Sequence, residues 1–328
     1  MEVQPILDSC RKTLANRIIG QEEMIDGLLM ALIAEGHILL EGVPGLAKTL
    51  AVKSLADITG LAFKRIQFTP DLLPADLTGT MVWEQATGTF SVRRGPIFAN
   101  VILADEINRA PAKVQSALLE AMEEAQVTIG ETTYTLPHPF FVLATQNPIE
   151  HEGTYTLPEA ELDRFLLKLL IKYPRSEQEV AMLSFVAGKK NTSPLPQVLS
   201  IGMLRSLQVA ADAVHVDERL AAYIVSIVGA TRPAPVKGGQ REKNERNDKE
   251  GIYRYINFGA SPRASIALYR CARIHALFEG RSFVSPDDVK AVALPALRHR
   301  IVLSYEAEAD GLDPDAVISR ILSLVPVP

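Results

Sequence analysis

Cysteine is almost absent from this sequence. Only Cys10 and Cys271 occur among the 328 residues, and their spacing fits no metal-ligand pattern. Two cysteines are too few for a disulfide framework, which excludes the small secreted scaffolds that depend on one. We therefore expect two isolated thiols in a reducing compartment. The 328 residues are enough for two domains, each with a hydrophobic core.

Long apolar runs and an excess of positive charge are also lacking. The longest apolar stretch, 220–230, is too short to span a bilayer, and the first residues, MEVQPILDSCRK, contain no signal-peptide core. The net charge of −5 and the isoelectric point of about 5.8 argue against a dedicated nucleic-acid binder, which carries a basic footprint. We therefore predict a cytoplasmic protein with no membrane span and no nucleic-acid partner.

A glycine-rich loop at residues 42–49 is the feature around which the chain is organised. The apolar run 38–40 precedes it and a helix-like stretch follows, so the order is strand, loop and helix. The loop fills the phosphate-binding pattern G-x-x-x-x-G-K-[ST] except that Ala47 replaces a glycine. Alanine is harmless there with a helical φ and damaging if φ must be positive. Lys48 would reach the β- and γ-phosphates and the Thr49 hydroxyl would bind Mg²⁺, although a chance glycine turn remains an alternative on this motif alone.

Polar residues follow two further apolar runs. Residues 100–104 form a continuous apolar run, typical of a strand buried on both faces, and Asp105 and Glu106 come directly after it. In a P-loop ATPase the first carboxylate would hold Mg²⁺ and the second would activate the water that attacks the γ-phosphate. Asn147 follows the run 140–144 and could position that water or sense the γ-phosphate. Taken alone, the acidic pair could lie in an exposed turn, and Asn147 with Pro148 could form an ordinary turn.

The spacing of the apolar runs predicts the fold class. They begin near residues 38, 62, 100, 140 and 166 with helical patterns between them, which indicates an α/β fold with a parallel sheet. Ligands of such sheets bind at the carboxyl ends of strands, where Gly45, Asp105 and Asn147 all fall. Two β-hairpins are predicted near 81–92 and 126–135.

The chain after residue 175 has a helical pattern. Apolar stripes at helical spacing lie within 220–228 and 264–278, whereas 237–250 lacks apolar residues and is predicted to be a mobile loop. Pro262 follows a capping serine, which places Arg263 at a helix start. We expect a nucleotide-binding domain at 1–175, a linker at 176–196 and a helical domain at 197–328.

Together these segments resemble the AAA+ ATPases, and specifically the MoxR family. The matching stretches are RIIGQE (17–22), LLEGVPGLAKT (39–49), LADEINRA (103–110), ATQNP (144–148), LPEAELDRF (157–165) and GASPRA (259–264). The loop of that family is similar to GxPGxAKT, so on this resemblance Ala47 is a family trait. The resemblance implies a P-loop domain with a five-stranded parallel sheet and hairpin inserts, followed by a mostly α-helical lid domain.

The resemblance also implies a role for each matching residue. Arg164 resembles an arginine finger that reaches a neighbour's ATP, and Arg263 resembles the sensor 2 residue of the lid; without the family, Arg164 would be an ordinary surface or ion-paired arginine. Glu106 and Lys48 would be catalytic, with Asn147 as sensor 1. The implied Mg²⁺ ligands are Thr49 and Asp105. The implied nucleotide-binding residues are Ile18, Ile19 and Gly20 near the adenine, together with Gly42, Val43, Pro44, Gly45, Leu46, Ala47, Lys48, Thr49, Leu50 and Asp105.

The implied activity is hydrolysis of ATP with Mg²⁺ to remodel, assemble or activate client proteins. An arginine delivered in trans completes the site only when subunits meet, and the family implies a hexameric ring of identical subunits. The implied partners are a protein with a von Willebrand factor A-type domain and a client protein. A chelatase-like motor subunit for metal insertion would share nearly every motif. A nucleic-acid motor or loader is disfavoured by the acidic charge, and an ATP-binding scaffold without turnover has no need of Glu106.

Overall fold

The computed structural model describes residues 3–43, 45–148, 154–187, 194–233, 236–237, 240–241 and 251–328. Contacts divide the chain into two compact units. The first unit comprises Met1–Phe165 and Leu169–Leu207, and the second comprises Leu166–Lys168 and Gln208–Pro328. No helix in the described ranges is long and apolar enough to cross a membrane.

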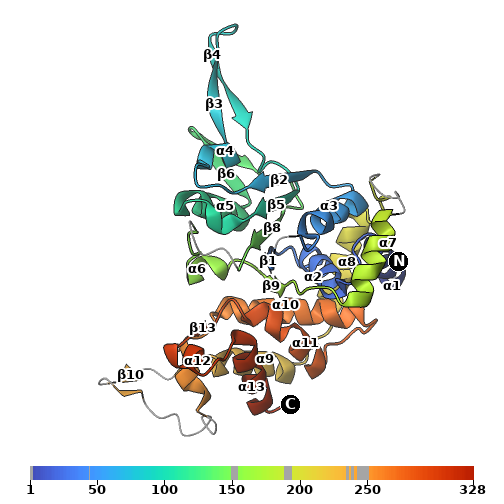
Figure 1. Ribbon diagram of the computed structural model, residues 1–328, viewed down its shortest axis with the longest axis vertical. Coiled ribbons are helices and arrows are strands. Elements are labelled where there is room, and N and C mark those ends of the chain that lie inside the picture. The colour runs from blue at the N-terminus through green and yellow to red at the C-terminus, as the bar shows by residue number, and fades with distance from the viewer. Residues whose placement is uncertain are drawn as a thin grey trace. The chain divides into compact units, whose positions relative to one another are not determined.

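A five-stranded sheet organises the first unit (Figure 1). The order across the sheet is β2-β5-β8-β1-β9, and the pairs β2/β5, β5/β8 and β8/β1 are parallel. The predicted parallel α/β sheet is therefore confirmed, with the strand before the glycine loop next to β8. The strands are β1 (Ile38–Glu41), β2 (Phe63–Gln67), β5 (Val101–Asp105), β8 (Phe141–Gln146) and β9 (Leu167–Leu170).

The burial of these strands follows their sequences. The first four residues of β5 and of β8 are buried on both faces, as their continuous apolar runs predict. β2 lies at an edge of the sheet, and within it Ile66 is buried while its neighbours Arg65 and Gln67 are exposed. The edge strand therefore presents polar side chains on one face, and these become important for the site.

Helices α1–α7 and two hairpins complete the first unit. The hairpin β3–β4 extends as a two-stranded arm beyond α4 and β6 (Figure 1). Both predicted hairpins are confirmed, the second as β6–β7. The helices are α1 (Val3–Ala15), α2 (Glu22–Ile33), α3 (Lys48–Thr59), α4 (Pro74–Thr78), α5 (Ala112–Glu124), α6 (Glu159–Leu162) and α7 (Ser176–Ala187), with the 3₁₀ turn η1 (Ile107–Arg109). The hairpin strands are β3 (Gly79–Glu84), β4 (Thr89–Arg94), β6 (Gln126–Ile129) and β7 (Thr132–Thr135).

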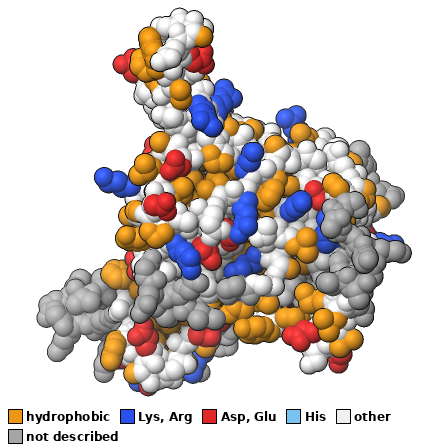
Figure 2. Space-filling model, turned by 45° about the horizontal axis from the view of Figure 1, so that its top comes forward, with side chains coloured by type: hydrophobic (Ala, Val, Ile, Leu, Met, Phe, Trp, Pro, Cys, Tyr) orange, Lys and Arg blue, Asp and Glu red, His pale blue; other side chains and the backbone are white. Residues whose placement is uncertain are grey.

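The β3–β4 arm has one apolar face. Trp83 pairs with Phe90 across the two strands, and their rings meet edge to face with centroids 5.0 Å apart. Both rings are more than half exposed, and apolar side chains of the arm are visible in Figure 2. At the base of the arm, the Arg94 guanidinium lies 5.5 Å from the ring centroid of Tyr134, which ties the arm to β7.

Residues 176–187, expected to form part of a linker, are instead the helix α7. Acidic side chains in its first turn are a helix-start signal that the linker assignment overlooked. The segment that begins at residue 194 then runs along α3, where the Leu195 N–H donates to Asp57 Oδ2 at 3.2 Å. These contacts keep the chain up to Leu207 in the first unit. Residues 188–193 lie outside the described ranges.

The second unit is mostly helical, as predicted. Its helices begin with side-chain caps: Asp217, Ser261, Ser285, Ser304 and Asp313 each accept a backbone N–H of the helix that follows. The helix start predicted at Pro262 is confirmed, and α11 begins in the same way at Pro286, after Ser285. Most of the predicted mobile loop 237–250 lies outside the described residues. The elements are α8 (Ile201–Ala213, shared with the first unit), α9 (Glu218–Ala230), β10 (Val236–Lys237), β11 (Gln240–Arg241), η2 (Ile252–Tyr255), β12 (Ile256–Phe258), α10 (Pro262–Phe278), α11 (Pro286–Leu297), β13 (Val302–Leu303), α12 (Tyr305–Ala309) and α13 (Pro314–Leu324).

Candidate functional site

Gly42 begins the glycine loop directly after β1. A Cβ atom at this position would lie 2.8 Å from the Cβ of Ile171 and 3.0 Å from its carbonyl oxygen, so only glycine fits there without displacing that segment. The Gly42 N–H donates to the Gln146 carbonyl at 3.3 Å, which anchors the loop to the end of β8. Gly45 has a φ of +88°, which glycine adopts without strain. Pro44, predicted to bind nucleotide, lies outside the described residues.

Ala47 adopts a left-handed conformation, with φ 56° and ψ 17°, at the N-cap of α3. Of the two cases distinguished from the sequence, the structure therefore has the strained one. A left-handed conformation costs an L-residue with a Cβ roughly 1–2 kcal/mol. The Ala51 N–H nevertheless donates to the Ala47 carbonyl at 2.9 Å, so the helix begins regularly.

The first turn of α3 faces the loop without a side-chain cap. Because Ala47 offers no side chain that could accept a hydrogen bond, the first N–H groups of α3 are not satisfied by a cap. Such a helix start favours an anion. Among the predicted loop residues, Leu46 is buried, and Val43, Lys48, Thr49 and Leu50 are partly exposed.

Lys48 connects the glycine loop with the acidic pair. Its Nζ donates to the Gly42 carbonyl at 2.5 Å. Burial lowers the pKa of Lys48, while the negative charges of Asp105, Glu106 and Glu41 raise it. The carboxylates of the acidic pair therefore favour the charged form of the loop lysine, against the effect of burial.

Thr145, which the sequence analysis did not select, holds the acidic pair together. Its Oγ1 donates to Asp105 Oδ1 at 2.7 Å and accepts the Glu106 N–H at 2.8 Å. Glu106 has φ 57° and ψ 51°, a left-handed conformation that is uncommon for a side chain of this size. The position of Thr145 at the end of a predicted strand, two residues before Asn147, is the signal that could have identified it.

Two residues of β2 were also missed. The Arg65 guanidinium donates to Asp105 Oδ2 through Nε at 3.0 Å and Nη2 at 2.5 Å. Gln67 Nε2 donates to Glu106 Oε2 at 2.8 Å, and Arg109 Nε lies 3.3 Å from the same oxygen. Each carboxylate of the acidic pair thus has a partner on the edge strand. Polar residues two apart at the end of a strand were the available signal.

Asn147 also lies at the carboxyl ends of the strands. It follows the last residue of β8 and is only 7% exposed. Because β8 lies between β5 and β1, the strand order brings Asn147, the acidic pair and the glycine loop to neighbouring strand ends.

The connector at residues 18–20, predicted to lie near the adenine, packs within the first unit. Ile18 is buried and Ile19 is half-buried. Gly20 has a φ of +74°, and a Cβ there would lie 2.5 Å from the side chain of Gln178 in α7. The connector and α7 therefore form one surface of the unit that also contains the glycine loop.

The two predicted arginines lie in different units. Arg164 donates through Nη1 to the Leu119 carbonyl at 2.7 Å, and its Nη2 lies 3.3 Å from Glu123 Oε2, so it is held by α5 of its own subunit. Arg263 belongs to the second unit and occupies the first turn of α10, where its N–H donates to the Oγ of Ser261 at 3.0 Å.

The residues present fit a magnesium ion. Asp105 and Thr49 offer the carboxylate and hydroxyl oxygens that Mg²⁺ prefers. Asp105 already attracts a cation, because the Arg65 guanidinium is bound to it. Among the described residues, no group of three or more His, Cys, Asp or Glu side chains could hold a metal ion. Mg²⁺ is usually bound by one or two carboxylates together with water and substrate phosphates, a donor set to which Asp105 and Thr49 would contribute.

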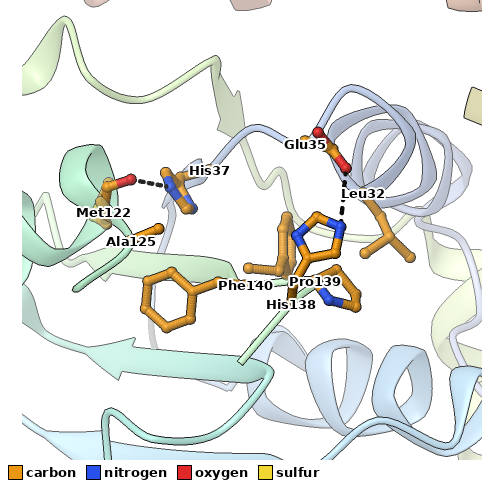
Figure 3. Close-up of a pocket in the computed structure, with 9 residues that line it drawn as sticks. Leu32, Glu35, His37, Met122, Ala125, His138, Pro139 and Phe140 are labelled. Carbon is orange, nitrogen blue, oxygen red and sulfur yellow. Dashed lines mark hydrogen bonds and ion pairs between the residues drawn. The ribbon is translucent and has the colours of Figure 1, made fainter. Parts of the chain in front are cut away.

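A separate cavity of about 180 Å³ lies at the amino ends of β1 and β8 (Figure 3). His37 immediately precedes β1, and Phe141 is the first residue of β8. The cavity therefore lies at the amino ends of the strands, whereas the acidic pair lies at their carboxyl ends. None of the predicted site residues lines it. Its lining residues are Leu32, Glu35, His37, Met122, Ala125, His138, Pro139, Phe140 and Phe141.

Comparisons with known proteins agree with this geometry. Residues 37–167 match the family described as "ATPase family associated with various cellular activities (AAA)", and residues 252–321 match "AAA lid domain". The first range contains the glycine loop and the acidic pair, and the second contains Arg263.

Relatives that match nearly the whole of this chain are also similar. The chain is 47% identical over 313 residues to Chaperone MoxR1 of Mycobacterium tuberculosis, covering 95% of this chain and 79% of that protein. It is 32% identical over 332 residues to Protein MoxR of Methylorubrum extorquens, covering 97% and 94% of the two chains. A crystal structure of a candidate ATPase from Cytophaga hutchinsonii, 46% identical, superposes with a TM-score of 0.90 and covers 99% and 96% of the two chains.

Proposed function

We propose that this chain, which belongs to the MoxR family of AAA+ ATPases, hydrolyses ATP with Mg²⁺ and uses the energy to remodel, assemble or activate client proteins. One observation carries this proposal. The strand order brings the glycine loop with Lys48, the acidic pair and Asn147 to the carboxyl ends of β1, β5 and β8 in one parallel sheet. Ligands of such sheets bind at these strand ends, and a phosphate-binding lysine together with two carboxylates there suits ATP and Mg²⁺.

The proposed roles follow from this arrangement. The N–H groups of the glycine loop bind the phosphates, and Lys48 exchanges the Gly42 carbonyl for phosphate oxygens. Glu106 accepts a proton from the attacking water, and Asn147 holds that water in position. Asp105 and Thr49 would hold Mg²⁺, which when bound neutralises charge on the phosphates.

Assembly completes the proposed site. Arg164 would reach the nucleotide of a neighbouring subunit, so that hydrolysis requires a head-to-tail contact, and such contacts close into a ring, here a hexamer. To do so Arg164 must leave Leu119 and Glu123 of its own α5. Arg263 would report the bound nucleotide to the helical domain. The proposed partners are a von Willebrand factor A-type protein and a client in the cytoplasm, and the name of the Mycobacterium relative, a chaperone, supports the remodelling activity.

A Glu106→Gln variant tests the proposal. We expect it to bind ATP as the wild type does and to hydrolyse it at least 100-fold more slowly, because a neutral amide cannot accept the proton of water. Binding is measured with a fluorescent ATP analogue and turnover by phosphate release. The matched control is Glu131→Gln, an exposed carboxylate in the turn between β6 and β7, which should hydrolyse normally. A Glu106→Gln protein with more than a tenth of wild-type turnover would refute the assignment.

The same variant should trap the client. With ATP bound and hydrolysis blocked, a client complex should persist through affinity purification. A protein that copurifies with Glu106→Gln in ATP, but not with the Lys48→Ala variant, is the expected result. Identical copurification with both variants would contradict ATP-dependent remodelling.

A further inference from the structure

Arg65 occupies the carboxylate that would hold Mg²⁺. Both oxygens of Asp105 are engaged: Oδ1 accepts the Thr145 hydroxyl at 2.7 Å, and Oδ2 accepts two N–H groups of Arg65 at 2.5 and 3.0 Å. A guanidinium fork on a carboxylate is among the stronger charge-assisted contacts in proteins. The Asp105 side chain is 14% exposed and that of Arg65 is 49% exposed, so the arginine covers the carboxylate from the solvent side.

The strand geometry fixes this arginine in place. Arg65 and Gln67 are two apart on β2 and therefore point to the same face, opposite to the buried Ile66. Arg65 Nη2 also donates to Gln67 Oε1 at 3.0 Å, so the guanidinium has two acceptors from two strands.

We propose that Arg65 is a positioning residue that neutralises Asp105 in the metal-free subunit and thereby sets the Mg²⁺ concentration at which nucleotide binding tightens. The inference rests on the proposed function. Asp105 Oδ2 accepts two N–H groups and has no lone pair left for a small cation, whereas Oδ1 keeps one beside the Thr145 hydroxyl. A cation at Asp105 would therefore lie close to the Arg65 guanidinium, and the two positive charges repel. Mg²⁺ loses its water reluctantly and is usually held by one or two carboxylates together with substrate phosphates. Arg65 therefore raises the Mg²⁺ requirement of the empty site, and nucleotide phosphates help to overcome it.

The test measures nucleotide affinity against free Mg²⁺. Binding of fluorescent ADP to the full chain is followed in EDTA and at increasing Mg²⁺ for the wild type, Arg65→Gln and Arg65→Lys. We expect Arg65→Gln to lower the half-effective Mg²⁺ concentration roughly 3- to 10-fold, while the affinity in EDTA stays unchanged. Arg65→Lys keeps the positive charge but loses the two-pronged guanidinium contact with Asp105. Its half-effective Mg²⁺ concentration should therefore lie between those of the wild type and Arg65→Gln.

Two controls separate this role from a structural one. Arg93→Gln removes an exposed arginine from β4 in the same unit and should leave the midpoint unchanged. In an Asp105→Asn background, Arg65→Gln should no longer shift the midpoint, because the carboxylate for which the two cations compete is gone.

The possible outcomes are distinct. An unchanged or higher Mg²⁺ midpoint in Arg65→Gln overturns the inference. A loss of affinity in EDTA also overturns it, because Arg65 would then bind the phosphates directly. If the wild type binds no nucleotide at any Mg²⁺ concentration, the proposed function itself fails, and the inference fails with it.

Discussion

His37 makes the stability of the first unit depend on pH. It lies immediately before β1 and is 8% exposed, at the cavity shown in Figure 3. The Val142 N–H donates to Nδ1 at 3.1 Å, so Nε2 must carry the proton, and it donates to the Met122 carbonyl at 3.1 Å. A second proton, on Nδ1, would face the Val142 N–H and replace that hydrogen bond by a contact between two donors. The folded subunit therefore requires a neutral imidazole.

The magnitude follows from the pKa. Burial lowers the pKa of His37 from its ordinary 6.5 to about 4, and the hydrogen bond to Met122 opposes this only in part. Since the folded pKa lies below the unfolded one, this contribution to stability is complete above pH 6.5 and is lost as the pH falls towards 4. The loss is about 2 kcal/mol at pH 5 and about 3 kcal/mol once both states are protonated.

The assay compares denaturant unfolding of the wild type and His37→Gln between pH 7.5 and pH 5. A glutamine amide can both accept and donate a hydrogen bond but does not titrate in this range, so the variant should be less stable at pH 7.5 and lose about 2 kcal/mol less than the wild type on acidification. His138→Gln is the matched control, because His138 is 62% exposed at the rim of the same cavity and should leave the pH dependence intact. Equal pH dependence in the wild type and His37→Gln would refute the reasoning. An NMR titration of the wild type in which the His37 imidazole has its midpoint above pH 5.5 would also refute the reasoning.

Three further predictions address strain, a buried ion pair and assembly. Ala47→Gly should raise the free energy of unfolding by about 0.5–1 kcal/mol in a denaturant titration, because glycine removes the left-handed strain at the cost of backbone entropy; a lower value would contradict this. Asp288→Asn should lower the stability of the second unit by about 3 kcal/mol in thermal unfolding, because the Arg281 guanidinium then loses its fully buried carboxylate partner. A change below about 1 kcal/mol would show that this ion pair does not stabilise the unit. Burial alone would raise the pKa of Asp288, but hydrogen bonds from Arg281, the Ser285 backbone and His275 hold it well below its usual range, so the pair should persist under mild acid. Arg164→Ala should abolish turnover, and mixing it with Lys48→Ala subunits should restore part of it; no recovery at any ratio would argue against action in trans.

The strands and the glycine loop could be predicted because their signals are local. The continuous apolar run before Asp105 is buried on both faces, and the loop at 42–49 directly joins β1 to α3, as the sequence indicates. The helix starts at Pro262 and Pro286 follow from a serine and a proline in sequence. In each case the residues that determine the structure are within a few positions of one another.

The contacts around the acidic pair could not be predicted because they depend on strand order. β8 follows β5 by about forty residues in the chain but lies beside it, and this alone brings Thr145 to Asp105. Arg65 reaches the same carboxylate from the other side because β2 is the opposite neighbour of β5. Sequence spacing gives the ends of strands but not which strands are neighbours. The contact of Arg164 with Leu119 on α5 spans 45 residues in sequence, so it too depends on the tertiary arrangement.

The location of backbone strain sets two residues of the candidate site apart from the rest of the described chain. In the described parts of the chain, four residues other than glycine have a positive φ: Glu35, Ala47, Glu106 and Ala125. Glu35 and Ala125 end helices α2 and α5, where a left-handed residue is common because it satisfies terminal carbonyls. Ala47 and Glu106 instead begin helical segments, where the preceding residue normally has extended dihedrals, so helix termination cannot explain their strain. These two residues belong to the glycine loop and the acidic pair, and strain held at such positions is maintained where the surrounding contacts require that geometry.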